Sequence, residues 1–398
     1  DSKEAEQAYH DYWEDFETPF WEAEVQTGRV KYSRSSLFLY HWLTARTRED
    51  FTAREVFTQF KHYVTTRQPD VPTLLPQLKA AADKYRAVID GSQKISGELS
   101  RVELFAYRVS TLDSELARPL LIWLDEPEQA DVPVADRERI LDILESWFVR
   151  RALVKATSAG SNRMMVDRPA HLAKSSHDAL PAALESYLTG LHAPAVGYWP
   201  DDGEVRAALT DTTAYWRYLR GRLRMVLEAL EDHRRGYPSG AKLAMGPVIR
   251  GKATIEHVMP QNWSKNWPAD LTDAEQAERG QLIQSLGNLT LVTQALNSKL
   301  SNEAWAIKRA ALQRVGDVLL TNEIVNGAPE VWDEETIRIR TRKLIEEIIK
   351  VWPVPEGHVG SATPSRAAAV QTTADVDIAG LVNAGWLSAG QQLTKRPE

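Results

Sequence analysis

The sequence predicts a mainly α-helical protein with a small mixed α+β part toward its C-terminal end. Up to about residue 233, apolar residues recur at intervals of three and four, and runs of alternating β-branched residues are few. A cluster of Gly, Pro and Ser follows Gly236, and two short β-compatible runs come after it, over residues 253–259 and 288–293. We therefore expect a multi-helix domain followed by a smaller α+β domain.

The multi-helix domain is expected to span residues 1–240. The segments with the strongest helical pattern are separated by Pro and Gly and cover residues 38–43, 137–154, 180–191 and about 211–230. In the last segment Thr210 or Asp211 can cap the first turn. The apolar stripe expected for that segment consists of Trp216, Leu219, Leu223, Val226, Leu227 and Leu230.

The α+β domain is expected over residues 241–352. Beyond the two β-compatible runs, the pattern predicts a helix over about 303–319, capped by Ser301 or Asn302, and a closing helix over about 334–352 that Pro353 ends. Residues 353–377 hold few large apolar side chains and are expected to form a flexible linker. Residues 378–398 regain an apolar pattern and are expected to be part of a further module.

Composition excludes several kinds of site. The 398 residues include no cysteine, so disulfides, cysteine nucleophiles and thiolate zinc sites are ruled out. The sequence contains no apolar run near the ~20 residues that span a bilayer, and its acidic start is unlike an export signal, so we expect a cytoplasmic protein with no membrane partner. The net charge of −7 means that any attraction to nucleic acid must come from local basic patches.

One segment carries most of the functional information. Residues 255–261 read Ile-Glu-His-Val-Met-Pro-Gln, residues 287–291 read Gly-Asn-Leu-Thr-Leu, and residues 297–302 read Asn-Ser-Lys-Leu-Ser-Asn. An acid and an imidazole thus stand at the end of one short strand, with amides and a lysine nearby. Hydrolysis of a phosphodiester needs a base for water, a cation for the leaving oxygen, and oxygen ligands if that cation is magnesium.

At these residues the chain resembles the His-Me finger (HNH) nucleases, which have a ββα-metal unit. The resemblance implies that His257 is the general base, that Asn288 orients its imidazole by bracing the backbone turn, and that Asn297 is a metal ligand. Glu256 stands where the family often has an acidic ligand, and Mg²⁺ or another divalent cation is the implied cofactor. Asn297 could instead cap the next helix, and Asn302 is an alternative for both roles.

The same residues, with Trp305, Lys308 and Arg309, resemble the C-terminal nuclease domain of GmrSD-type modification-dependent restriction enzymes, a group that includes the SspE anti-phage proteins. Residues 145–151 and 199–202 are similar to the helical region that precedes this nuclease. The resemblance implies a metal-dependent DNA endonuclease of a restriction or anti-phage defence system, providing phage resistance. The family's N-terminal ParB-like nucleotidase domain, its sensor, has no matching motif here, and we expect that it precedes Asp1 in a longer protein.

Two groups of basic residues are candidates for contact with DNA phosphates. They are Lys299, Lys308 and Arg309 beside the motif, and Arg220, Arg222 and Arg224 in the densest basic stretch. A solvated helix face paired with nearby acids is the alternative for the second group.

Two other functions stay open at this stage. One is a helical scaffold with a degenerate nuclease unit that only binds DNA or a protein, and the other is a nuclease that acts on RNA. Self-association into a homo-oligomer is also left open.

Overall fold

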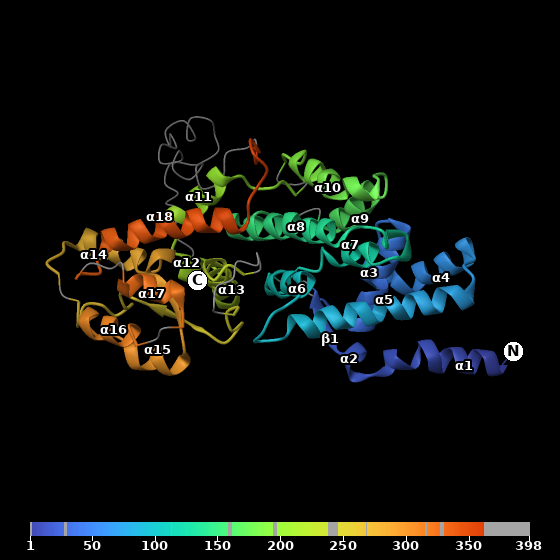
Figure 1. Cartoon of the computed structure of the whole chain (residues 1–398), viewed down its shortest axis with the longest axis horizontal. Coiled ribbons are helices and arrows are strands. Elements are labelled where there is room, and N and C mark those ends of the chain that lie inside the picture. The colour runs from blue at the N-terminus through green and yellow to red at the C-terminus, as the bar shows by residue number, and fades with distance from the viewer. Residues whose placement is uncertain are drawn as a thin grey trace, which may run out of the picture.

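The computed structural model describes residues 2–361, except 28–29, 113, 158–160, 194–196, 238–245, 268, 315–316 and 327–329. Its described part is mostly helical, with two antiparallel two-stranded sheets, which confirms the predicted mainly α class. The molecule is elongated, with α1–α10 toward one end, α14–α18 toward the other and α13 between the two groups (Figure 1). None of the described helices is both long and apolar enough to cross a membrane.

The N-terminal half contains ten helices and one hairpin among its described residues. Their bounds are α1 Ser2–Tyr12, α2 Pro19–Glu22, β1 Glu24–Thr27, β2 Val30–Ser33, α3 Arg34–Thr47, α4 Val56–Arg67, α5 Val71–Ser92, α6 Arg101–Thr111, α7 Arg118–Leu124, α8 Val134–Val154, α9 Ser161–Leu172 and α10 Leu180–Thr189. Local sequence explains several starts: the Ser100 side chain caps α6, and Glu103 completes the capping box. The expected helices around residues 38–43, 137–154 and 180–191 are confirmed as α3, α8 and α10.

The remaining elements surround the second sheet. Their bounds are α11 Asp202–Thr210, α12 Ala214–Arg217, α13 Arg220–Arg234, β3 Thr254–His257, α14 Asp273–Leu282, β4 Leu289–Val292, α15 Gln294–Leu300, α16 Trp305–Leu312, α17 Leu319–Asn326 and α18 Glu334–Val351. Both β-compatible runs and the closing helix are confirmed.

One apolar core supports the second sheet, and it draws on both sides of the domain boundary expected at 240–241. The core buries together Val149 and Leu153 of α8, six apolar side chains of α13, Ile255 of β3, and Leu344 and Ile348 of α18. A core shared in this way holds α13 rigidly against the strands, because closely packed interiors transmit displacement. Residues before 241 therefore help to position the candidate site.

Two predicted helices differ from the structure. The helix expected over 211–230 is interrupted at Tyr218, whose backbone is extended and whose hydroxyl donates to the Leu153 carbonyl oxygen at 2.6 Å. This break leaves Trp216 and Leu219 largely exposed instead of on the apolar stripe. The helix expected over 303–319 is two helices, α16 and α17.

The linker predicted over 353–377 is not flexible over its described part. Ser146 Oγ donates to the Pro353 carbonyl oxygen at 2.6 Å, and His358 Nε2 lies 2.8 Å from the Trp199 carbonyl oxygen. The Gly360 N–H donates to Asp201 Oδ2 at 3.0 Å. These bonds fasten residues 353–361 to α8 and to the start of α11. The rest of the expected linker, and the module expected over 378–398, lie outside the described residues.

Candidate active site at the end of strand β3

Strands β3 and β4 place the motif residues side by side. Their antiparallel register sets Glu256 opposite Thr290 and His257 opposite Leu289. Every residue of β4 is buried, so this register is specified by the core beneath it. The helix α15 follows directly after β4, and the Thr293 side chain caps it. Strand β4 pairs with β3 and leads directly into α15, while α14 lies between the two strands in the chain.

His257 is buried at the end of β3, with 7% of its surface exposed. Its Nε2 lies 3.2 Å from Gln284 Oε1, and its Nδ1 lies 3.5 Å from Gln261 Nε2. The Tyr215 ring contacts the imidazole edge-on, with ring centroids 4.3 Å apart. Gln284 offers an oxygen and Gln261 an N–H, so the two contacts favour the tautomer that carries its proton on Nε2. Nδ1 is then the acceptor, on the side of the exposed Gln261.

The surroundings of His257 keep its imidazole neutral. Burial lowers its pKa to about 4, and the positive charges of Lys308 and Arg220 act in the same direction. The hydrogen bond with Gln284 opposes this shift. At neutral pH the ring is therefore unprotonated and can accept a proton.

Asn288 braces the chain just beyond His257. Its Oδ1 accepts from the Met259 N–H at 2.8 Å and from Trp332 Nε1 at 3.1 Å. Its Nδ2 donates to the carbonyl oxygens of Met259 and Ile283, at 2.8 and 2.9 Å. This geometry agrees with the expected bracing role, although Asn288 holds the backbone two residues after His257 and does not bond to the imidazole.

Glu256 and Lys308 form a buried ion pair. Lys308 Nζ donates to Glu256 Oε1 at 2.6 Å and to the His257 carbonyl oxygen at 2.7 Å, and the lysine has no exposed surface. Burial raises the pKa of Glu256 and lowers that of Lys308, and their mutual attraction opposes both shifts. The position of Lys308 does not fit the expected contact with DNA, because a phosphate cannot reach its ammonium group. Lys308 instead ties α16 to β3.

The other residues expected near the motif occupy α15 and α16. Asn297 lies inside α15, and its Nδ2 donates to the Ile255 carbonyl oxygen at 3.2 Å. It is therefore not a helix cap, and Asn302 is not one either, because Ala304 is the N-cap residue of α16. Lys299 is exposed in the last turn of α15, and Arg309 is half-buried in α16. Both remain candidates for contact with DNA.

The three arginines expected to contact DNA differ in position. Arg220 is exposed at the start of α13, and its guanidinium lies over the ring of Tyr215, the residue that contacts His257. Arg222 donates to the Leu112 carbonyl oxygen at 3.0 Å, and Arg224 donates to that of Gly251 at 3.2 Å. The Arg220 guanidinium also donates to backbone, at the carbonyl oxygens of Tyr215 and Tyr218. All three groups thus bind neighbouring backbone, and Arg220 stays a candidate for DNA contact because it alone of the three is exposed.

The side chains in this arrangement do not fit the expected magnesium site. Glu256 is neutralised by Lys308, and it points to the opposite face of the strand from His257 because neighbouring strand residues alternate. The Asn297 amide is turned toward Ile255. Within the described ranges, no three His, Asp or Glu residues come close enough together to hold a metal ion. A cation bound to Glu256 would lie beside a buried ammonium, which repels it.

Two residues that contact the imidazole belong to no motif that could be recognised in the sequence. Gln284 lies 27 positions after His257 in the chain and is 2% exposed. Tyr215 lies 42 positions before His257, and its backbone N–H donates to the Gln284 carbonyl oxygen at 2.9 Å. Both residues resemble ordinary surface or core positions in the sequence, since only the folded chain brings them to β3.

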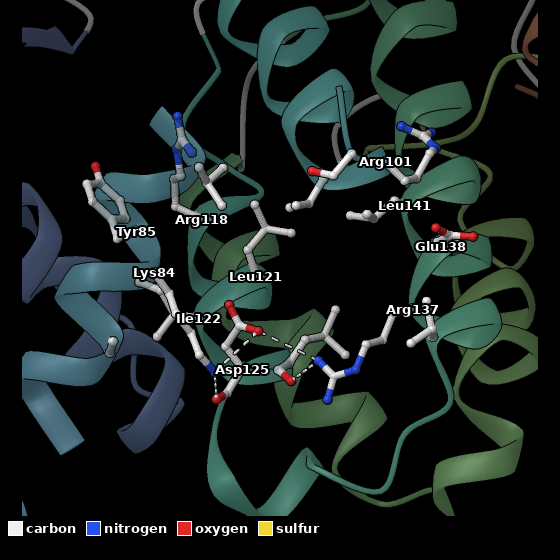
Figure 2. Close-up of a pocket in the computed structure, with 16 residues that line it drawn as sticks. Lys84, Tyr85, Arg101, Arg118, Leu121, Ile122, Asp125, Arg137, Glu138 and Leu141 are labelled. Atoms are coloured by element: carbon white, nitrogen blue, oxygen red, sulfur yellow. Dashed lines mark hydrogen bonds and ion pairs between the residues drawn. The ribbon is translucent and has the colours of Figure 1, made fainter. Parts of the chain in front are cut away.

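A cavity of about 280 Å³, open to the surface on one side, lies elsewhere, among α5, α6, α7 and α8. Figure 2 shows Lys84, Asp125 and Arg137 joined at one side of it, with Leu121, Ile122 and Leu141 among the apolar residues of its wall. The described residues that line it include neither His257 nor Asn288. This cavity is therefore separate from the candidate site.

Comparison with known protein families places the site in a class. Residues 199–347 match the C-terminal domain of the GmrSD restriction endonucleases, which confirms the predicted resemblance to GmrSD-type restriction proteins. The match includes α13, both strands of the site and the first turns of α18. The matched family is one of restriction endonucleases, so the match supports a nuclease function of that type for this part of the chain. No curated protein gives a significant match to the chain.

Proposed function

We propose that this chain is the DNA-cleaving part of a restriction or anti-phage defence system and that its second sheet with α15 is an HNH-type ββα nuclease unit. The observation that carries the proposal is the imidazole of His257 at the end of β3, held by Gln284 inside the matched domain, and burial lowers its pKa so that the ring is neutral. Its Nε2 is held by Gln284, so that Nδ1 is left as a base. The pairing of β3 with β4 and the helix α15 directly after β4 support the same assignment.

In the proposed reaction His257 Nδ1 accepts a proton from a water molecule as the water oxygen attacks the phosphorus atom. The bond from phosphorus to the 3′ oxygen breaks, and that oxygen takes a proton from solvent. The products are a 3′ hydroxyl and a 5′ phosphate. Arg220, exposed beside Tyr215, is placed to offset the negative charge that develops on the phosphate oxygens.

Dependence on Mg²⁺ or another divalent cation stays an expectation from the resemblance. Because Glu256 is paired with Lys308, we assign no step of the reaction to a metal ion. We assign selectivity for modified DNA to the nucleotidase domain that the resemblance implies. The cytoplasmic location of the protein also stays a prediction.

A plasmid-nicking assay tests the proposal. We expect the chain to convert supercoiled plasmid into open-circular and linear DNA when Mg²⁺ is added, and His257→Ala to abolish this conversion. A chain that binds plasmid without nicking it, with or without Mg²⁺ or Mn²⁺, would favour the scaffold function. Cleavage of RNA in preference to DNA would favour the ribonuclease alternative.

A further inference from the structure

A cationic groove of about 520 Å³ lies where the N-terminal helices meet the segment that leads into β3. Among the described residues that line it, five are basic and one, Glu115, is acidic. The basic residues are Arg34, Lys94, Arg118, Arg250 and Lys252. In a chain with a net charge of −7, such a groove concentrates positive potential at one place, which attracts anions.

Arg250 is the least explained of these residues. It is only 1% exposed, and its Nε donates to the Lys94 carbonyl oxygen at 3.2 Å, while its Nη2 donates to that of Gly97. Its Nη1 is buried and has no hydrogen-bond partner among the described residues. Buried donors are rarely left unpaired, because losing water without a new partner is costly. Because Nη1 has almost no exposed surface, Arg250 does not contact an anion itself; its other two bonds hold residues 94–97 beside Lys252, and its charge adds to the positive potential of the groove.

The neighbouring side chains suit a phosphate. Lys94 is 55% exposed although it pairs with Glu103, and Lys252 is exposed. Arg118 lies over the ring of Tyr85, and Figure 2 shows the two side by side at the edge of the adjoining cavity. Guanidinium and ammonium groups together are the usual partners of phosphate oxygens.

The groove is tied to the candidate active site through α13 and β3. Glu228 of α13 accepts from the Gly251 N–H at 2.7 Å, and Arg224 of the same helix donates to the Gly251 carbonyl oxygen. Arg220, one turn earlier, lies beside the residue that contacts His257. Lys252 precedes His257 by five residues, a distance of at most about 17 Å in extended chain.

We propose that this groove binds the sugar–phosphate backbone of the DNA strand that is cut. At a rise of about 3.4 Å per nucleotide, the distance of at most about 17 Å from Lys252 to His257 places the bound phosphates within about five nucleotides of the cleaved bond. The inference rests on the proposed function, since it assigns the path of that function's substrate. The exposed ammonium groups of Lys94 and Lys252 contact neighbouring phosphates, and the buried positive charge of Arg250 adds to the attraction without contacting them.

Binding of a short fluorescein-labelled DNA duplex, measured by anisotropy over a salt series, tests this inference. All proteins carry His257→Ala, so that no cleavage interferes. The double variant Lys94→Gln/Lys252→Gln is expected to bind about 10-fold more weakly, with a log–log salt slope shallower by about 1.8, since each phosphate contact contributes about 0.9. The matched control is Lys61→Gln/Lys174→Gln, which removes two exposed lysines elsewhere and should bind as the parent does.

Two outcomes would overturn the inference. One is a double variant that binds DNA as tightly as the control. The other is that the groove binds free nucleotide and not duplex DNA. In that case deoxyadenosine monophosphate raises the melting temperature of the parent but not of the double variant, while the two proteins bind the duplex equally well. The plasmid assay separates this test from the test of the proposed function. If the double variant binds DNA more weakly but the unmutated chain nicks no plasmid, the groove is a DNA-binding surface and the proposed nuclease function is wrong.

Discussion

Gln284 Oε1 lies 3.2 Å from His257 Nε2, and both side chains are buried. The amide oxygen can only accept, so it selects the imidazole tautomer with the proton on Nε2 and leaves Nδ1 as the acceptor, 3.5 Å from Gln261 Nε2. The Gln284 carbonyl oxygen also accepts from Tyr215, whose ring contacts the same imidazole. One residue thus controls both the tautomer of His257 and the position of the ring that packs on it.

We first predict that Gln284 acts as a positioning residue. Its bond raises the pKa of His257 against the effect of burial, so Gln284→Ala should lower that pKa further and weaken the base. The nicking rate should fall about 10-fold while DNA affinity is unchanged, because a misoriented base loses part of a general-base contribution of about 10²–10⁴. Gln284→Glu should instead move the acid limb of the pH–rate profile to higher pH. Identical profiles for all three proteins would mean that Gln284 serves packing alone.

The second prediction concerns His257 itself. His257→Ala should lower the nicking rate by about 10²–10⁴-fold, the usual contribution of a general base. The measurement is nicking of supercoiled plasmid at equal protein concentration, with circular dichroism to verify the fold. His62→Ala is the matched control, since His62 is exposed on α4. If His62→Ala lost as much activity as His257→Ala, the loss would not be due to removal of a general base, and the assigned role of His257 would be wrong.

The third prediction is a loss of stability in mild acid. Burial lowers the pKa of His257 from 6.5 to about 4 and that of His41 from 6.5 to about 3. Below pH 6.5 the two histidines are protonated in the unfolded chain but stay neutral in the folded chain. The free energy of unfolding therefore falls as the pH falls from 6.5 toward 4. At pH 5 each histidine accounts for a loss of roughly 2 kcal/mol at 1.36 kcal/mol per pKa unit.

Urea unfolding at pH 7 and pH 5 measures this effect. His41→Leu and His257→Gln should each be less sensitive to the change than the parent. A free energy of unfolding that stays constant between the two pH values would show that neither ring is buried as a neutral group.

The fourth prediction addresses Glu256 and Lys308. Lys308→Met leaves a buried carboxylate unpaired and should destabilise the protein by about 3–5 kcal/mol, as is usual when one partner of a buried ion pair is removed. Because the structure pairs Glu256 with Lys308, Glu256→Gln should lower stability without changing the Mg²⁺ concentration that gives half-maximal nicking. A Mg²⁺ titration of parent and variant well below the melting temperature measures this. A large increase in the Mg²⁺ requirement would show that Glu256 leaves Lys308 to bind metal.

Much of the arrangement could be predicted from the chain alone. Periodicity and breakers located β3, β4, α8 and α18, because each contains a repeating apolar pattern that the core then buries. The motif around His257 and Asn288 was visible for the same local reason, since the two residues belong to short runs with a characteristic spacing. The resemblance that these runs support is confirmed over residues 199–347.

Other features depend on partners that are distant in sequence, and only the tertiary structure decided them. The break between α12 and α13 follows from the bond of Tyr218 to Leu153, and residues 353–361 are held by α8 and the start of α11. Lys308 has the sequence pattern of a solvated helix residue, but the fold buries it against Glu256. Sequence determined which residues could do chemistry, because residue type and spacing are local. Their tautomers, charges and accessibility depended on burial and long-range contacts, which exist only once the chain has folded.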